Sequence, residues 1–148
     1  MQTFLPYCNF SMSAACLDRA RLGKQRVETL QILKALLLPD YGWKSHPAVR
    51  MWEGCDQLLV LYGWAICNEW IARGYQDTCL AKILAFHDPS RPFNVLWWLG
   101  EKAFHDSHKS KLLQKKPDHY NQFNWDVPRD LDYWWPTKNN LTRTKTMV

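Results

Sequence analysis

The sequence predicts a mainly α-helical protein: a single compact domain with an extended, aromatic-rich C-terminal segment. Two long stretches carry apolar residues at spacings of three and four, the period of an amphipathic helix. No alternation of apolar and polar residues, the mark of a strand, lasts for five residues. A chain of 148 residues also has the length of one domain. We therefore predict a helical domain at residues 1–136 and a flexible, polar and basic tail at residues 137–148.

The first long helix is expected to follow a short apolar segment that Pro6 keeps from being helical. Ser11 or Ser13 can cap this helix, which should run to about Leu38, before Pro39. One face carries the polar side chains Arg21, Lys24, Gln25 and Glu28. The opposite face is the predicted buried stripe, made of Ala20, Gly23, Val27, Leu30, Leu33 and Leu37.

The second long helix is predicted at residues 47–73, and we expect it to be central. Ser45 or His46 can cap it, Pro47 suits its first turn, and Gly74 lies just past its end. Its apolar stripe consists of Trp52, Cys55, Leu59, Tyr62, Ile66 and Trp70.

The rest of the chain alternates between helices and loops. A shorter helix is expected at residues 77–85, and the two prolines in residues 87–92 indicate a loop. A further helical stretch is expected at about residues 94–114, with a break near residues 105–108. From Pro117 onward the chain should be extended and rich in turns.

The totals favour an anionic partner and a reducing compartment. The net charge is +5 and the isoelectric point is about 9.0, which makes nucleic acid a candidate. Nine Trp, six Tyr and six Phe make the chain rich in aromatic rings; most must line the core or a groove, but Trp beside Lys and Arg can also hold unstacked bases. Five cysteines, an odd number with no CxxC pair, predict reduced, buried thiols in a cytoplasmic protein. The longest apolar stretch, residues 58–72, is too short to span a bilayer, so no membrane partner is expected.

Two basic clusters are the candidate DNA-binding surface. The first lies at residues 17–28, where cations surround two carboxylates on the early helix, and the second lies at residues 105–116. Lysine, arginine, histidine and short hydroxyl side chains suit phosphate oxygens, although a solvated helix face is the competing interpretation. The candidate DNA-binding residues are Arg19, Arg21, Lys24, Gln25, Arg26, His46, Arg50, His105, Ser107, His108, Lys109 and Lys111.

A metal site and a bound cofactor are not expected. His105 and His108 can share a helix face and His119 follows, but zinc requires a third or fourth well-placed ligand. A phosphate-contacting or structural role suits these histidines better. The chain also has no glycine-rich phosphate loop, nucleophile elbow or HExxH motif.

Several segments together resemble a group of small proteins similar to the pyrimidine-dimer DNA glycosylase (phage endonuclease V) family. The segments that carry the resemblance are residues 1–7, 21–28, 46–52, 69–75, 107–113, 116–120 and 132–136. The likeness to the small group covers nearly the whole chain. The likeness to the characterised glycosylase rests mainly on the arginine-rich early helix and on the step Arg73-Gly74-Tyr75.

The resemblance implies a compact all-α protein that acts on damaged duplex DNA without a metal. In the family the α-amino group of the mature N-terminus attacks the sugar carbon as the glycosidic bond breaks, which gives a Schiff base. A glutamate on the early helix assists, and β-elimination then nicks the strand. An α-amino group ordinarily has a pKa of about 8, so an appreciable fraction is nucleophilic at neutral pH. By resemblance, the catalytic candidates are Glu28 and the Met1 amine.

Two departures from the family pattern leave alternatives open. Residue 2 is Gln, which is large for removal of the initiator Met and tends to cyclise when it is N-terminal. Val27 separates Arg26 from Glu28, whereas the family has Arg followed directly by Glu, and one residue is a rotation of about 100° on a helix. Asp18 is the reserve carboxylate. Without the amine, a monofunctional glycosylase that activates water remains open.

The sequence therefore predicts a monomeric DNA glycosylase, with or without AP-lyase activity, that excises a damaged or modified base. One alternative is a DNA-binding module without catalysis, which needs the cations but not Glu28. Another is an enzyme that acts on nucleotides or modified nucleosides, which would lack the steep salt dependence of DNA binding.

Overall fold

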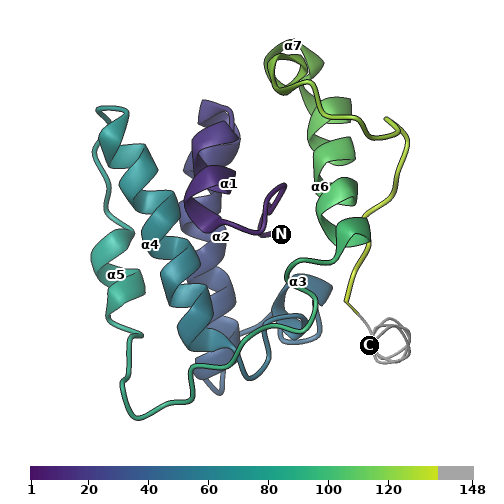
Figure 1. Ribbon diagram of the computed structural model, residues 1–148. Helices are drawn as coiled ribbons and strands as arrows, with labels where there is room; N and C mark the ends of the chain where they lie inside the picture. The colour runs from purple at the N-terminus through teal and green to yellow at the C-terminus, as the bar shows by residue number, and fades with distance from the viewer. Residues whose placement is uncertain (137–148) are drawn as a thin grey trace.

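The computed structural model describes residues 1–136, and within them every regular element is a helix, which confirms the predicted mainly α fold (Figure 1). The predicted tail at residues 137–148 lies outside the described residues. In chain order the helices are α1 Phe10–Cys16, α2 Arg19–Leu37, α3 Pro47–Arg50, α4 Asp56–Ala72, α5 Leu80–Leu84, α6 Lys102–Lys115 and α7 Pro117–Tyr120, followed by the 3-10 turn Asn121–Phe123.

Helix α4 is central, as predicted, and packs against α1, α2 and α5 (Figure 1). Its side chains Leu59, Tyr62 and Ile66 are fully buried, whereas Trp70 at the end of the predicted stripe is only half-buried. Gly63 allows the closest approach, because a Cβ built there would lie 2.9 Å from methyl carbons of Ile83 and Thr29. Helices α2, α4 and α5 therefore meet at a position where only glycine fits without a shift.

The predicted helix from Ser11 or Ser13 to Leu38 was wrong in two respects. The chain breaks between α1 and α2. The cap of α1 is Asn9, whose Oδ1 accepts a hydrogen bond from the amide of Met12 over 2.9 Å. At the break Arg73 donates to the carbonyl oxygen of Leu17 over 2.8 Å, and His119 Nε2 donates to that of Cys16 over 2.9 Å. Side chains distant in sequence thus satisfy the carbonyls that end α1.

The predicted helix at residues 47–73 is also two helices, because α3 ends at Arg50 and α4 begins at Asp56. His46 caps α3 as predicted, accepting at Nδ1 from the amide of Ala48 over 3.0 Å. In the turn between the helices Gly54 has a φ of +76°, a conformation that glycine adopts readily.

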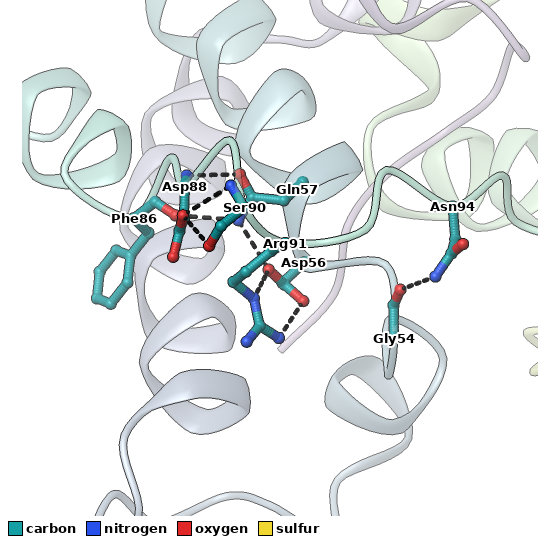
Figure 2. A network of polar contacts seen from close by, with 8 residues as sticks. All are labelled: Gly54, Asp56, Gln57, Phe86, Asp88, Ser90, Arg91 and Asn94. Atoms are coloured by element: carbon teal, nitrogen blue, oxygen red, sulfur yellow. Dashed lines mark hydrogen bonds and ion pairs between the residues drawn. The ribbon is translucent and has the colours of Figure 1, made fainter.

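The loop after α5 is fastened to the start of α4, as Figure 2 shows. Arg91 donates two hydrogen bonds of 2.8 Å to the carboxylate of Asp56. Gln57 donates to the carbonyl oxygen of Phe86 over 3.0 Å and accepts from the amide of Asp88 over 2.9 Å. These contacts hold an irregular segment, so the helix predicted from residue 94 begins only at Lys102.

The C-terminal part needs two further corrections. Helix α6 continues through residues 105–108 without a break, and a short helix, α7, stands where an extended chain was predicted. Beyond residue 124 the predicted extended segment is present and follows α6 (Figure 1). It is attached there by hydrogen bonds from the amide of Leu131 to Ser110 Oγ and from the amide of Trp134 to Ser107 Oγ, each 3.1 Å long.

The buried face of α2 differs from the predicted stripe. Val27 is 45% exposed and Ala20 is exposed, whereas Leu22, Gln25 and Thr29 are buried. The reason is that α2 packs against α4 and also against the N-terminal segment, which covers a polar part of its surface.

The prediction that the cysteines are buried was wrong only for Cys8, which is exposed, and none of the five forms a disulfide. Among residues 1–136 no helix has both the length and the hydropathy that a bilayer crossing requires.

Candidate active site

The N-terminal segment lies between α2 and α6, with its backbone held by side chains from both helices (Figure 1). The amide of Phe4 donates to Gln25 Oε1 over 2.8 Å. The amide of Leu5 donates to His108 Nδ1 over 2.9 Å, and its carbonyl oxygen accepts from His105 Nδ1 over 2.7 Å. The position of the chain's first residues is therefore set by three side chains that lie far from them in sequence.

Gln25 is the centre of this network, and its carboxamide is fully used. Its Oε1 accepts from Phe4 and from the hydroxyl of Tyr62, both over 2.8 Å. Its Nε2 donates to the carbonyl oxygen of Gln2 over 2.9 Å and to Glu28 Oε2 over 2.8 Å. The side chain is 1% exposed, so Gln25 holds these groups in place from inside the protein.

Glu28 receives a second hydrogen bond, from the amide of Gln2 to the same Oε2 over 3.3 Å. The two donors hold one carboxylate oxygen, and the side chain is half-buried. Glu28 lies in a hollow of about 370 Å³ into which α2, α6, the N-terminal segment and the C-terminal segment all contribute. The lining residues are Met1, Gln2, Phe4, Ala20, Arg21, Lys24, Gln25, Glu28, Lys115 and Tyr133.

A larger groove of about 900 Å³ lies on the other side of the edge of α2 that carries Glu28. Ala20, Lys24 and Glu28 border both the hollow and the groove, at spacings of four residues along α2. The groove is lined by side chains of α2, α4 and α7 and by Lys116, which lies between α6 and α7. Its remaining lining residues are Asp18, Arg19, Gly23, Val27, Gln31, Trp70, Lys116 and His119.

Electrostatic effects connect His46 and Tyr133 with this hollow. Burial lowers the pKa of His46; the positive N-terminal amine lowers it further, and the negative charge of Glu28 opposes both effects. Burial raises the pKa of Tyr133 to about 12, with Arg21 acting against the rise and Glu28 adding to it. The N-terminal amine and Glu28 thus both act on the pKa of His46, and Glu28 also acts on that of Tyr133.

Asp18, the reserve carboxylate, makes structural contacts and does not line the hollow. It is 4% exposed, accepts from the hydroxyl of Tyr120 over 2.5 Å and forms an ion pair with Arg21 at 3.3 Å. Burial opposes ionisation of this carboxyl, but the bonds from Tyr120 and Arg21 outweigh burial and lower its pKa. With both oxygens occupied, Asp18 is poorly suited to proton transfer.

Besides Gln25, and Arg21 with its ion pair to Asp18, four further candidate DNA-binding residues make internal contacts. Arg26 pairs with Asp77 at 2.6 Å, and its guanidinium lies 4.3 Å from the ring centroid of Trp70. Ser107 Oγ donates to the carbonyl oxygen of Phe104 over 2.8 Å, and the two buried histidines of α6 bind Leu5. We therefore leave Gln25 and these four, Arg26, His105, Ser107 and His108, out of the proposed DNA surface.

The other candidates lie at the surface or at its margin. Arg19 is exposed, with its guanidinium 5.3 Å from the ring centroid of Tyr75. Lys109 lies over the ring of Tyr7 and Lys111 over that of Tyr133, at 5.4 and 5.3 Å. Arg50 is exposed on α3 and borders a separate hollow lined by Trp97, Trp98 and Trp135.

The two histidines considered as metal ligands both direct Nδ1 at the backbone of Leu5. His105 Nε2 accepts in addition from the amide of Gly100 over 2.9 Å. Burial lowers the pKa of His105, and it lowers that of His108 to about 3. Within residues 1–136 no group of three His, Cys, Asp or Glu side chains is placed to bind a metal ion.

Besides the apolar Phe4 and Ala20, three polar residues that line the hollow were missed by sequence reasoning. Lys115 belongs to the second basic cluster, so its type and place in the sequence were available as a signal. Gln2 contributes its amide through the backbone, which no residue type reveals. Tyr133 lies more than 100 residues from Glu28, and no local pattern indicates that the C-terminal segment returns to α2.

A family model described as pyrimidine dimer DNA glycosylase matches residues 1–83. The match includes the N-terminal segment, the whole of α2 and Glu28, and ends within α5. No curated protein and no solved structure matches the chain significantly. Because the family model covers more than half of the chain, including the carboxylate and the N-terminus that share the hollow, this protein belongs to the pyrimidine dimer DNA glycosylase family.

Proposed function

We propose that this protein is a DNA glycosylase that excises a damaged or modified base from duplex DNA, with Glu28 as its catalytic carboxylate. The observation that carries the proposal is the 3.3 Å hydrogen bond from the amide of Gln2 to Glu28 Oε2. It joins the start of the chain to Glu28, which borders both the hollow and the groove.

The amine of Met1 is the proposed nucleophile. Its nitrogen forms a bond to C1′ of the deoxyribose as the glycosidic bond breaks, and the base leaves with the bonding electrons. Loss of a proton from nitrogen and opening of the C1′–O4′ bond give an imine. Glu28 stabilises the cationic sugar and carries the protons of these steps. Removal of a C2′ proton and cleavage of the C3′–oxygen bond then nick the strand.

The groove is the proposed path of the DNA backbone. Arg19, Lys24 and Lys116 border it, and short-range contacts between such cations and phosphates position a duplex without reading its sequence. Lys24 also borders the hollow, so one cation can hold the phosphate next to the reacting sugar. Both sides of α2 thus contribute to one proposed interface.

The test is borohydride trapping on a labelled duplex with one abasic site, followed by intact mass and peptide mapping of the adduct. We expect an adduct on the Met1 amine. An adduct on an internal lysine would keep the lyase but reject Met1 as nucleophile. If no adduct forms while excision from a panel of damaged duplexes is observed, water is the nucleophile and Glu28 its base.

The same panel addresses the two alternatives. A protein that only binds DNA would show salt-dependent affinity and no excision with any lesion. An enzyme of free nucleotides would turn over nucleosides and bind duplex DNA with little salt dependence. Either result would reject the proposed glycosylase activity.

A further inference from the structure

Trp43, in the loop between α2 and α3, combines high exposure with a strained backbone. Its side chain is 62% exposed, against 47% for Trp64, the next most exposed of the nine tryptophans. Its φ is +68°, in the left-handed region that bulky L residues rarely adopt because Cβ crowds the backbone. Burial of the ring does not offset this strain, and residues held in such conformations cluster at functional sites.

The backbone around Trp43 is fastened on both sides. The next residue, Lys44, donates from Nζ to the carbonyl oxygens of Ala35 and Leu38, each over 2.6 Å, and so caps the C-terminal end of α2. The carbonyl oxygen of Trp43 accepts from the amide of His46 over 3.0 Å. The ring is therefore presented to solvent from a loop that is already ordered.

A row of aromatic contacts leads from Trp43 to the hollow. Its ring meets that of His46 edge to face, with centroids 6.1 Å apart, and His46 meets Trp135 in the same way at 6.2 Å. The rings of Trp135 and Tyr133 are 5.5 Å apart, and Tyr133 lines the hollow with Met1 and Glu28. Trp43 is the exposed outer end of this row.

We infer that Trp43 stacks on a DNA base that has left the helical stack beside the reacting nucleotide. The inference rests on the proposed function, because an enzyme that acts at C1′ of a base in duplex DNA must unstack the target. An aromatic ring stacks on any base, since every base has a π-face. A ring held by an ordered loop loses little conformational freedom on stacking.

The first experiment compares Trp43→Leu with Trp64→Leu, which removes an exposed tryptophan from the outer side of α4. The probes are a duplex with one tetrahydrofuran abasic analogue and the same duplex unmodified. We expect Trp43→Leu to weaken binding of the abasic duplex roughly 5- to 150-fold, the range for one base–aromatic stack, and to leave the unmodified duplex nearly unchanged. Trp43→Phe should keep most of the preference, and Trp64→Leu all of it.

A second readout separates stacking from general damage to the fold. A 2-aminopurine next to the abasic position should be quenched by the wild-type protein and remain bright with Trp43→Leu. Trp43→Gly removes the ring and relieves the positive φ, so it should lose the preference for the abasic duplex without losing thermal stability.

If Trp43→Leu and Trp43→Gly keep the wild-type preference while borohydride trapping and Glu28→Gln behave as proposed, the inference is overturned and the proposed function stands. If the wild-type protein binds neither duplex, the proposed function and the inference fail together.

Discussion

Gln25 donates a hydrogen bond from Nε2 to Glu28 Oε2 over 2.8 Å, from one turn earlier on α2. The same nitrogen donates to the carbonyl oxygen of Gln2 over 2.9 Å. One buried carboxamide thus orients the carboxylate and the start of the chain relative to each other. Since both groups belong to the proposed chemistry, Gln25 is a positioning residue rather than a contact to DNA.

Glu28→Gln should abolish most turnover and leave DNA affinity intact. A neutral amide cannot move protons or stabilise a cationic sugar, and such roles contribute about 10²- to 10⁴-fold to the rate. The measurement is single-turnover excision or nicking of an abasic duplex, with the Kd measured in parallel. The matched control is Glu53→Gln, which changes an exposed glutamate. Wild-type turnover in Glu28→Gln, with loss in Asp18→Asn, would transfer the role to Asp18.

Gln25→Leu should lower both stability and turnover. The buried amide of Phe4 loses its acceptor, which costs about 1–3 kcal/mol in the free energy of unfolding, whereas the hydroxyl of Tyr62 keeps the carbonyl oxygen of Phe4 as an acceptor at 2.9 Å. Urea denaturation gives this value, and kcat reports the displaced N-terminus. The exposed Gln76→Leu is the control. A variant as stable as the wild type would show that water replaces Gln25 in the network.

Lys24→Ala should weaken DNA binding equally for different sequences and reduce the salt dependence. A lysine that neutralises one phosphate contributes about one to the slope of log K against log salt concentration. Titrations at several salt concentrations measure the slope. The control is Lys82→Ala on α5, which borders neither the hollow nor the groove. Equal slopes for Lys24→Ala and the wild type would exclude this phosphate contact.

His108 should make the protein less stable as the pH falls from about 6.5 to about 3. Burial lowers the pKa of this imidazole from 6.5 to about 3, so in this range the unfolded chain takes up a proton that the folded protein refuses. The contribution of neutral His108 to the free energy of unfolding is complete above pH 6.5. It is lost on acidification, by up to about 1.4 kcal/mol per pH unit.

The check is urea unfolding of the wild type and His108→Asn across this range. Asparagine offers the amide of Leu5 an acceptor but cannot be protonated, so its stability curve should be flatter. His87→Asn, at an exposed histidine, should follow the wild type. Parallel curves for all three proteins would mean that His108 does not cause the acid sensitivity.

Gly63→Ala should destabilise the fold by about 1–3 kcal/mol. Its new methyl group would lie 2.9 Å from carbons of Ile83 and Thr29, in the contact among α2, α4 and α5. Thermal or urea unfolding measures the effect. Gly42→Ala is the control, because a Cβ there meets nothing within 4 Å. An unchanged stability for Gly63→Ala would show that α5 can move away without loss.

The sequence by itself determined the helical class and the central position of the helix predicted at residues 47–73, whose central part is α4. The packing of the N-terminus beside the helix that carries Glu28 was implied only by the family resemblance. The helical class and the central helix follow from local causes. The apolar spacing selects a helix and a long apolar stripe must be buried. The family model matches residues 1–83, and these residues include the first of the segments that carry the resemblance.

Only the tertiary structure decided which polar residues face inward. Gln25 and Arg26 look like surface residues on a helical wheel, yet one binds the N-terminal segment and the other pairs with Asp77. The break after Cys16 depends likewise on capping by distant side chains such as Arg73. Tyr133 reaches the hollow because the C-terminal segment is attached to α6. Helical periodicity records the burial of apolar groups, whereas a buried polar side chain is set by a partner that local sequence does not reveal.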